Sequence, residues 1–175
     1  FRSGASLKCL VVDDMLVDDF SMPQMPKLEK MLINYGNVSS NLVSKNNKKI
    51  NNLRKFENVP NLNQLNVDIE YDCDYGIEFR SLKKNNIKNL KIHHLNPKYV
   101  DELIKIKNLS ELDISLWDKK NKVTEKNFEF LKDLKNLKKL KLSGGGHGTI
   151  LIDYKKMMTF ISKDIENLEL DIVYK

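Results

Sequence analysis

The glycine-rich segment Gly144–Gly148 and the adjacent histidines His93 and His94 are the parts of this sequence that most resemble chemical sites. The glycine-rich segment lacks the Lys-Ser or Lys-Thr that follows the glycines of a phosphate-binding loop, and the sequence shows no dinucleotide-binding fingerprint. His93 and His94 are neighbours in a predicted strand, so they should point to opposite faces and could not chelate one metal ion together. We interpret Gly144–Gly148 as a flexible loop that leaves a strand, with a binding loop as the alternative.

Acidic residues form three clusters that could hold a cation: Asp13-Asp14, Asp18-Asp19 and the run Tyr-Asp-Cys-Asp-Tyr at 71–75. None of them has the ligand spacing of a calcium-binding loop, so we interpret them as solvated acids in turns. No Ser-His-Asp or Cys-His arrangement can be placed in the sequence either. We therefore expect a protein that is not an enzyme, with no catalytic residues, no metal site and no cofactor.

The composition indicates one globular domain. The chain has 175 residues, of which 41% are hydrophobic and 31% charged, and this balance excludes a disordered protein. No stretch approaches the ~20 apolar residues of a membrane-spanning helix, so we expect no membrane contact. Two cysteines, Cys9 and Cys73, are too few for a disulfide scaffold. Residues 1–6 do not resemble a signal peptide, and together these observations favour a cytoplasmic protein.

The charge balance is positive but poor in arginine. Lys and Arg together number 30 against 24 Asp and Glu, which gives a net charge of +6. Only Arg2, Arg54 and Arg80 are arginines, whereas a nucleic-acid surface would use the two-pronged guanidinium group as well as lysine. We therefore consider nucleic-acid binding possible but do not favour it.

A repeated pattern, L-x-x-L-x-L with aliphatic substitutes, occurs seven times. The copies begin at Leu7, Leu28, Leu62, Ile87, Leu109, Leu137 and Ile165. All 21 template positions are apolar, and a further apolar residue stands three positions before the copy at Met25, Val59, Ile106 and Leu134. Alternating apolar residues are typical of a half-buried strand, and one such strand cannot bury its face alone. We therefore expect the copies to stack edge to edge and to bury all 21 positions in a common core.

The segments between the copies are expected to return as helices. Asn96-Pro97 is a favourable helix start, and it precedes the apolar residues Val100, Leu103, Ile104 and Ile106. Thr124 can cap a helix with Phe128, Leu131 and Leu134 on its inner face, and Asp153 can cap one with Met157, Met158 and Ile161. A shorter helix is expected around Ile50, Leu53 and Phe56.

These features together resemble the leucine-rich repeat family, over about residues 7–172. The resemblance implies an α/β solenoid of about seven repeats in a single domain over residues 1–175, with a parallel sheet on the concave face and helices and irregular loops on the convex face. The usual asparagine or cysteine three positions after the third apolar residue is missing, since those positions hold Met15, Gly36, Glu70, Leu95, Trp117, Gly145 and Val173. The array is therefore divergent, and its turns must be satisfied in another way.

Strand alternation identifies the side chains of the concave face that are expected to bind a partner. They are Asp13, Lys30, Asn34, Gln64, Asn66, Asp68, Asn89, Lys91, His93, Glu111, Asp113, Ser115, Lys139, Lys141, Ser143, Glu169 and Asp171, with Asn167 and the more apolar Cys9, Val11 and Leu32 beside them. This face has four lysines and six carboxylates, so its net charge is −2. The positive excess of the chain is therefore expected on the outer helices and loops.

The expected function is a non-catalytic scaffold for protein–protein interaction, which binds a protein or peptide on the concave face. The alternative is a structural subunit of a ribonucleoprotein or another large assembly, docked through a lysine-rich convex surface. We also expect the chain to be part of a longer array or complex, with end-on contact to further repeats or to another subunit, because open strand edges favour pairing.

Overall fold

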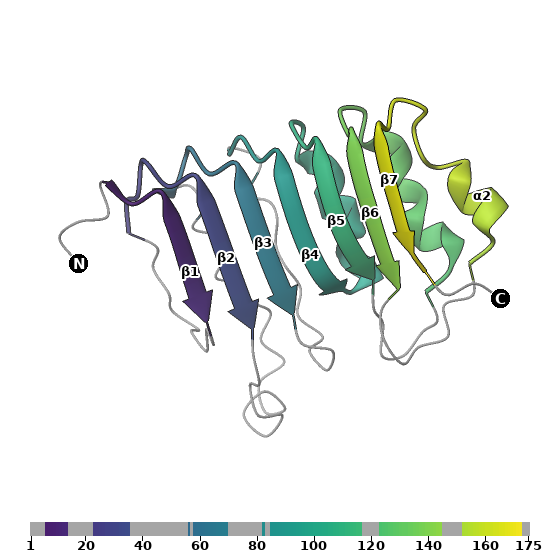
Figure 1. Ribbon diagram of the computed structural model, residues 1–175, viewed down its shortest axis with the longest axis horizontal. Helices are drawn as coiled ribbons and strands as arrows, with labels where there is room; N and C mark the ends of the chain where they lie inside the picture. The colour runs from purple at the N-terminus through teal and green to yellow at the C-terminus, as the bar shows by residue number, and fades with distance from the viewer. Residues whose placement is uncertain are drawn as a thin grey trace, which may run out of the picture.

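Seven β-strands form one sheet in a computed structural model of the chain (Figure 1). The structure describes residues 6–13, 23–35, 56, 58–69, 82, 85–116, 123–144 and 152–172. The strands are β1 (Cys9–Asp13), β2 (Lys30–Tyr35), β3 (Gln64–Ile69), β4 (Asn89–Leu95), β5 (Glu111–Leu116), β6 (Lys139–Gly144) and β7 (Asn167–Asp171). Each strand pairs in parallel with the next along the chain. The predicted fold class, an α/β solenoid of about seven repeats with one open parallel sheet, is confirmed.

The register of the sheet follows the hydrophobic repeat. Leu65 of β3 lies opposite Leu90 of β4, which lies opposite Leu112 of β5. All 15 template positions of the five middle repeats are at most 2% exposed. The two end repeats differ, because β1 and β7 each have a neighbouring strand on one side only. Their strand residues are half-buried, and Leu7 is 37% exposed, so the prediction of a buried position is wrong for Leu7.

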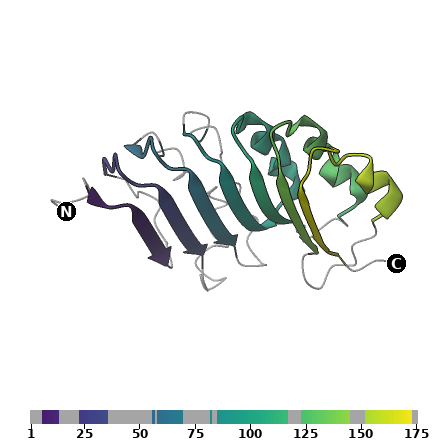
Figure 2. The same ribbon diagram turned by 45° about the horizontal axis from the view of Figure 1, so that its top comes forward.

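The outer layer covers one face of the sheet (Figure 2). It contains η4 (Pro97–Lys105), η5 (Glu125–Asp133) and the short helix α2 (Tyr154–Met158). Helices were predicted at all three places, but η4 and η5 are 3₁₀-helices. A 3₁₀-helix places every third residue on the same side, and most of the buried residues have that spacing: Val100, Leu103 and Ile106 in one segment, Phe128, Leu131 and Leu134 in the other. Phe130 is buried as well, outside this spacing.

The predicted helix starts hold in the structure. The Asn96 side chain accepts a hydrogen bond from the Lys98 backbone N–H at 3.1 Å, and the Asp153 side chain accepts one from the Lys156 N–H at 3.1 Å. These bonds satisfy backbone donors that a helix leaves free at its first turn. The inner face of α2 differs from the prediction, because Met157 is buried with Phe160 while Met158 and Ile161 are only half-buried. Ile104, placed in the inner stripe of η4, is exposed.

Asparagines before the strands join successive turns along the edge where the strands begin. The Asn61 side chain donates to the Pro26 carbonyl at 2.6 Å, and the Asn136 side chain donates to the Lys107 carbonyl at 2.8 Å. Both asparagines directly precede the first apolar residue of their repeat, as do Asn86 and Asn108, whose amides are joined at 3.0 Å. Each bond joins one turn to an earlier one, so the turns stack as a continuous edge of the sheet.

Asn85 is a buried polar residue that sequence reasoning did not single out. Its side chain is 6% exposed and donates to the backbone carbonyls of Phe56 and Val59, at 3.1 and 2.6 Å. Its own N–H bonds to the Leu82 carbonyl, as the N–H of Val59 bonds to that of Phe56. Asn85 therefore occupies the place that an apolar residue has in the preceding repeat. The sequence contains a signal for this position: Asn85 stands three residues after the apolar Leu82, as Val59 stands three residues after the apolar Phe56.

Some sequence predictions lie outside the described residues. They are the helix expected over 50–55, the acidic pair at 18–19, the acidic run at 71–75, the loop residues 145–148 and the side chain of Asp13. The proposed contact of the array ends with further repeats or another subunit is untested and stays a prediction.

Candidate binding surface on the open face of the sheet

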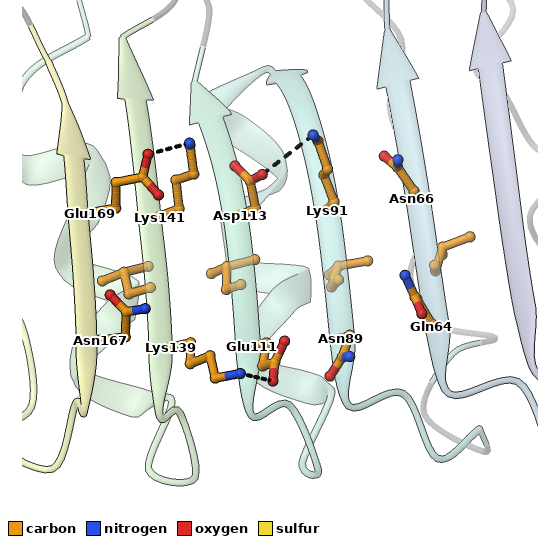
Figure 3. Close-up of a pocket in the computed structure, with 14 residues that line it drawn as sticks. Gln64, Asn66, Asn89, Lys91, Glu111, Asp113, Lys139, Lys141, Asn167 and Glu169 are labelled. Carbon is orange, nitrogen blue, oxygen red and sulfur yellow. Dashed lines mark hydrogen bonds and ion pairs between the residues drawn. The ribbon is translucent and has the colours of Figure 1, made fainter.

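The side chains opposite the outer layer form what we call the open face, which carries the residues predicted to bind a partner (Figure 3). Equivalent residues of successive repeats lie side by side because the strands are in register. The first row is Gln64, Asn89, Glu111, Lys139 and Asn167, and the middle row is Asn66, Lys91, Asp113, Lys141 and Glu169. The structure thus brings ten residues from five strands together on one surface.

The middle row alternates in charge, and its members pair across the strands. Lys91 Nζ lies 3.5 Å from Asp113 Oδ2, and Lys141 donates a hydrogen bond to Glu169 (Figure 3). The bond to Glu169 raises the pKa of Lys141. These pairs neutralise most of the charge of this row internally, so the row produces only a weak electrostatic field.

The first row contains one further cross-strand pair. Lys139 Nζ lies 2.8 Å from Glu111 Oε1, and this hydrogen bond raises the pKa of Lys139. The remaining three side chains of the row are amides, which can both donate and accept hydrogen bonds. The first row therefore has neutral hydrogen-bonding side chains on both sides of the Lys139–Glu111 ion pair.

Two oxygens of the middle row are buried without a hydrogen-bond donor from the described part of the chain. They are Asn66 Oδ1 and Asp113 Oδ1. Such an oxygen raises the free energy of the folded protein unless a donor reaches it. Both belong to half-buried residues, so a group approaching the open face can supply that donor. The two oxygens therefore mark acceptor positions at the centre of the face.

His93 lies between two carboxylates beside this centre. Its Nδ1 is 3.8 Å from Asp68 Oδ1 and its Nε2 is 3.8 Å from Asp113 Oδ1. Burial lowers the pKa of His93 below its ordinary value, and the neighbouring Lys91 lowers it further, while Asp113 and Asp68 oppose the shift. His93 is therefore neutral at pH 7 and can donate one hydrogen bond and accept another.

The strand alternation predicted for His93 and His94 is wrong. His94 has φ of 58°, and the pairing of β4 with β5 shifts between Ile92 and Leu95, so β4 bulges here. The two imidazole rings lie 6.1 Å apart in an edge-to-face arrangement. Ser115 Oγ accepts the His94 backbone N–H at 2.8 Å, and Ser115 is only 4% exposed. Ser115 thus stabilises the bulge, and we leave it out of the binding surface.

The amino-terminal strands continue the open face with a more apolar character. Val11 is 54% exposed, Cys9 is exposed with a free thiol, and Leu32 is half-buried. Lys30 is exposed and Asn34 half-buried on β2. At the other end Asp171 is exposed and Ser143 half-buried. These exposures agree with the predicted facing, and the face changes from apolar at β1 to charged at β7.

The open face is hollowed where the two rows cross β3 to β7. The hollow has a volume of about 280 Å³ and is lined by all ten residues of the two rows (Figure 3). Its floor is the backbone of the middle strands, and its walls are amides and paired charges. This shape and chemistry suit an extended segment or a protruding side chain of another protein.

The titration of His93 should report the electrostatics of this surface. We expect a midpoint below 6.5 in the folded protein, rising in Lys91→Met and falling further in Asp113→Asn. Because the folded pKa lies below the unfolded one, the unfolded chain binds more protons below about pH 6.5, and stability falls as the pH decreases. NMR titration of the His93 imidazole C–H signals measures this. A midpoint at or above 6.5 would contradict the described environment.

The open face has the features of a binding surface: acceptor oxygens, locally paired charges and a hollow. In the described part of the chain, no group of three or more His, Cys, Asp or Glu side chains is placed to hold a metal ion. Over the same residues, none of the helices has the length and apolar character needed to cross a membrane. Compared with known proteins, the sequence matches no family model and no curated protein.

Proposed function

We propose that this chain is a leucine-rich-repeat protein that binds a protein or peptide on its open face and catalyses no reaction. The observation that carries the proposal is the pair of buried acceptors, Asn66 Oδ1 and Asp113 Oδ1, on two residues that line a polar hollow. Backbone N–H groups or the side chains of Lys and Arg are donors of the kind these oxygens lack. The partner is therefore a polypeptide segment with a basic residue.

Two carboxylates on the open face, one exposed and one half-buried, support the proposal that the partner is basic. Asp171 is exposed at the end of β7, and Asp113 has one oxygen 3.5 Å from Lys91 while the other receives no hydrogen bond. Three of the four lysines of this face pair with carboxylates: Lys91 with Asp113, Lys139 with Glu111 and Lys141 with Glu169. The face therefore has more hydrogen-bond acceptors than it can satisfy itself, in agreement with its net charge of −2.

A displayed library of random peptides provides a test for which the partner need not be identified beforehand. We expect the wild-type protein to enrich peptides that contain Lys or Arg. The double variant Asp113→Asn/Asp171→Asn should bind these peptides at least about tenfold more weakly, a loss of roughly 1.4 kcal/mol or more. Fluorescence anisotropy of the selected peptides measures the affinity.

The matched control is Asp101→Asn/Asp133→Asn, which makes the same chemical change at two exposed residues of η4 and η5 on the opposite face. It should bind the peptides like the wild type. Equal affinity of the two double variants, or a selection that enriches no peptide, would remove the open face as the binding surface. Circular dichroism of both variants verifies that they are folded.

A further inference from the structure

The positive charge of the described chain is concentrated where the strands begin, and not on the outer helices. The helices η4, η5 and α2 contain six lysines and five carboxylates, so they are nearly neutral. The turns before the strands, residues 6–8, 23–29, 58–63, 85–88, 106–110, 134–138 and 162–166, contain seven lysines and three carboxylates. The positive excess was expected on the outer helices and loops, and among the described residues the helices alone do not carry it. We call these turns the strand-start edge, the upper edge in Figure 1.

Three lysines occupy equivalent positions in consecutive turns of this edge. Lys107, Lys135 and Lys163 each stand two residues before the first apolar residue of their repeat, and all three are exposed. We call them the lysine row. The Asn136 side chain donates to the Lys107 carbonyl and so holds two of these turns together. Adjacent strands lie about 4.8 Å apart, so the row places like charges at closely spaced steps.

The lysine row is built in the opposite way from the open face. On the open face, Lys91, Asp113, Lys141 and Glu169 alternate in sign across the same strands. Like charges directly opposite one another on neighbouring strands are destabilising. Two further exposed lysines, Lys88 and Lys138, lie on the same edge, and Glu166 pairs with Lys138 rather than with the row. A bound polyanion would offset the repulsion that the fold leaves in this row.

The composition of the edge indicates which polyanion fits. Its described residues include no Phe, Tyr, Trp or Arg, so it has neither a stacking platform for bases nor a guanidinium fork. Among the exposed large hydrophobic residues of the described chain, only Leu7 belongs to the edge, and it lies far from the row, beside β1. A specific peptide interface would need apolar anchors here. Evenly stepped point charges without anchors are suited to a phosphate backbone.

We propose that the strand-start edge binds the phosphodiester backbone of a nucleic acid, without base specificity, through Lys107, Lys135 and Lys163. This surface is separate from the open face and does not depend on peptide binding there. Each lysine–phosphate contact to a single strand contributes about −0.7 to the slope of log affinity against log salt. Three contacts therefore predict a slope of roughly −2, and an affinity loss of about 20-fold between 50 and 200 mM salt.

The test uses a short fluorescein-labelled single-stranded RNA and a labelled DNA duplex, both of mixed sequence, in anisotropy titrations. The variant Lys107→Gln/Lys135→Gln/Lys163→Gln should lose at least about tenfold in affinity at 50 mM salt and flatten the slope by about 2 units for RNA. The matched control, Lys98→Gln/Lys126→Gln/Lys155→Gln, removes one exposed lysine from each of the helices η4, η5 and α2 and should retain the wild-type slope.

Binding of either probe with this salt dependence and this loss in the row variant supports the proposal. Equal losses in the two triple variants would show attraction by net charge alone and overturn it. Absence of binding at 50 mM salt, or binding only to vesicles that contain phosphatidylserine, would also overturn it. Thermal unfolding shows that both variants are folded, and the row variant should melt at a slightly higher temperature at low salt because its repulsion is relieved.

Discussion

Replacing Leu112 with alanine is expected to lower the free energy of unfolding by about 2–5 kcal/mol. Leu112 is 2% exposed and lies in register between Leu90 of β4 and Leu140 of β6. The substitution removes buried methyl groups and leaves a cavity that the rigidly spaced strands cannot close. Urea unfolding followed by circular dichroism measures the effect.

The matched control is Leu168→Ala, at the equivalent position of β7. Leu168 is half-buried because β7 has a neighbouring strand on one side only. We expect Leu168→Ala to lower the free energy of unfolding by about half as much as Leu112→Ala does, because folding buries less apolar area of Leu168. Equal losses at the two positions would contradict the burial gradient along the array, and with it the stacking of seven repeats.

Replacing Asn85 is expected to have the second large effect. In Asn85→Ala the carbonyls of Phe56 and Val59 lose their donor in a buried place, which costs about 1–3 kcal/mol. Asn85→Val should also be destabilised, although valine is the residue at the equivalent place of the preceding repeat. Its side chain fills the space but provides no N–H group. Thermal and urea unfolding of the two variants separate lost packing from lost hydrogen bonds.

The substitution Asn85→Asp provides a sharper version of the same test. It keeps the shape of the side chain, removes both donors and directs a carboxylate at two carbonyl oxygens, so at pH 7 it should destabilise more than alanine does. The folded pKa of this new carboxyl should be raised, and its penalty should shrink as the pH falls toward about 4. Asn167→Asp, at an exposed residue of β7, controls for the general effect of acid. If Asn85→Asp is as stable as this control at pH 7, Asn85 does not stabilise the turns.

We propose different partners for two parts of the same sheet, the open face and the strand-start edge. The open face has surplus acceptors at Asn66 and Asp113, and the edge has surplus cations at Lys107, Lys135 and Lys163. On these two proposals, one scaffold would hold a basic polypeptide segment and a nucleic-acid backbone at once, since the two surfaces meet only where the strands begin. The Asp113/Asp171 and Lys107/Lys135/Lys163 variants test the two activities independently.

Much of the fold could be predicted because the apolar alternation is local. Leu90, Leu112 and Leu140 occupy the same template position, and aligned repeats already indicated that they stack. The same alignment placed Lys91, Asp113 and Lys141 side by side on one face. The lysine row was also present in the alignment. It was not recognised because the net charge was summed over the whole chain and not over each surface separately.

From the sequence, the stacking of the repeats predicted the register of the strands, and the family resemblance implied their parallel order. The two-residue alternation determined which side of the sheet stays polar, because it can bury its apolar face in one way only. The tertiary structure decided which neighbour each charge pairs with, since Asp113 has a lysine on either side in the row and bonds Lys91. It also decided the bulge at His94 and the inward turn of Asn85. Both features depend on groups from other repeats. The bulge depends on the Ser115 hydroxyl of β5, and the orientation of Asn85 depends on two backbone carbonyls before β3. Because the repeats are irregularly spaced, the sequence does not reveal which groups would be in contact.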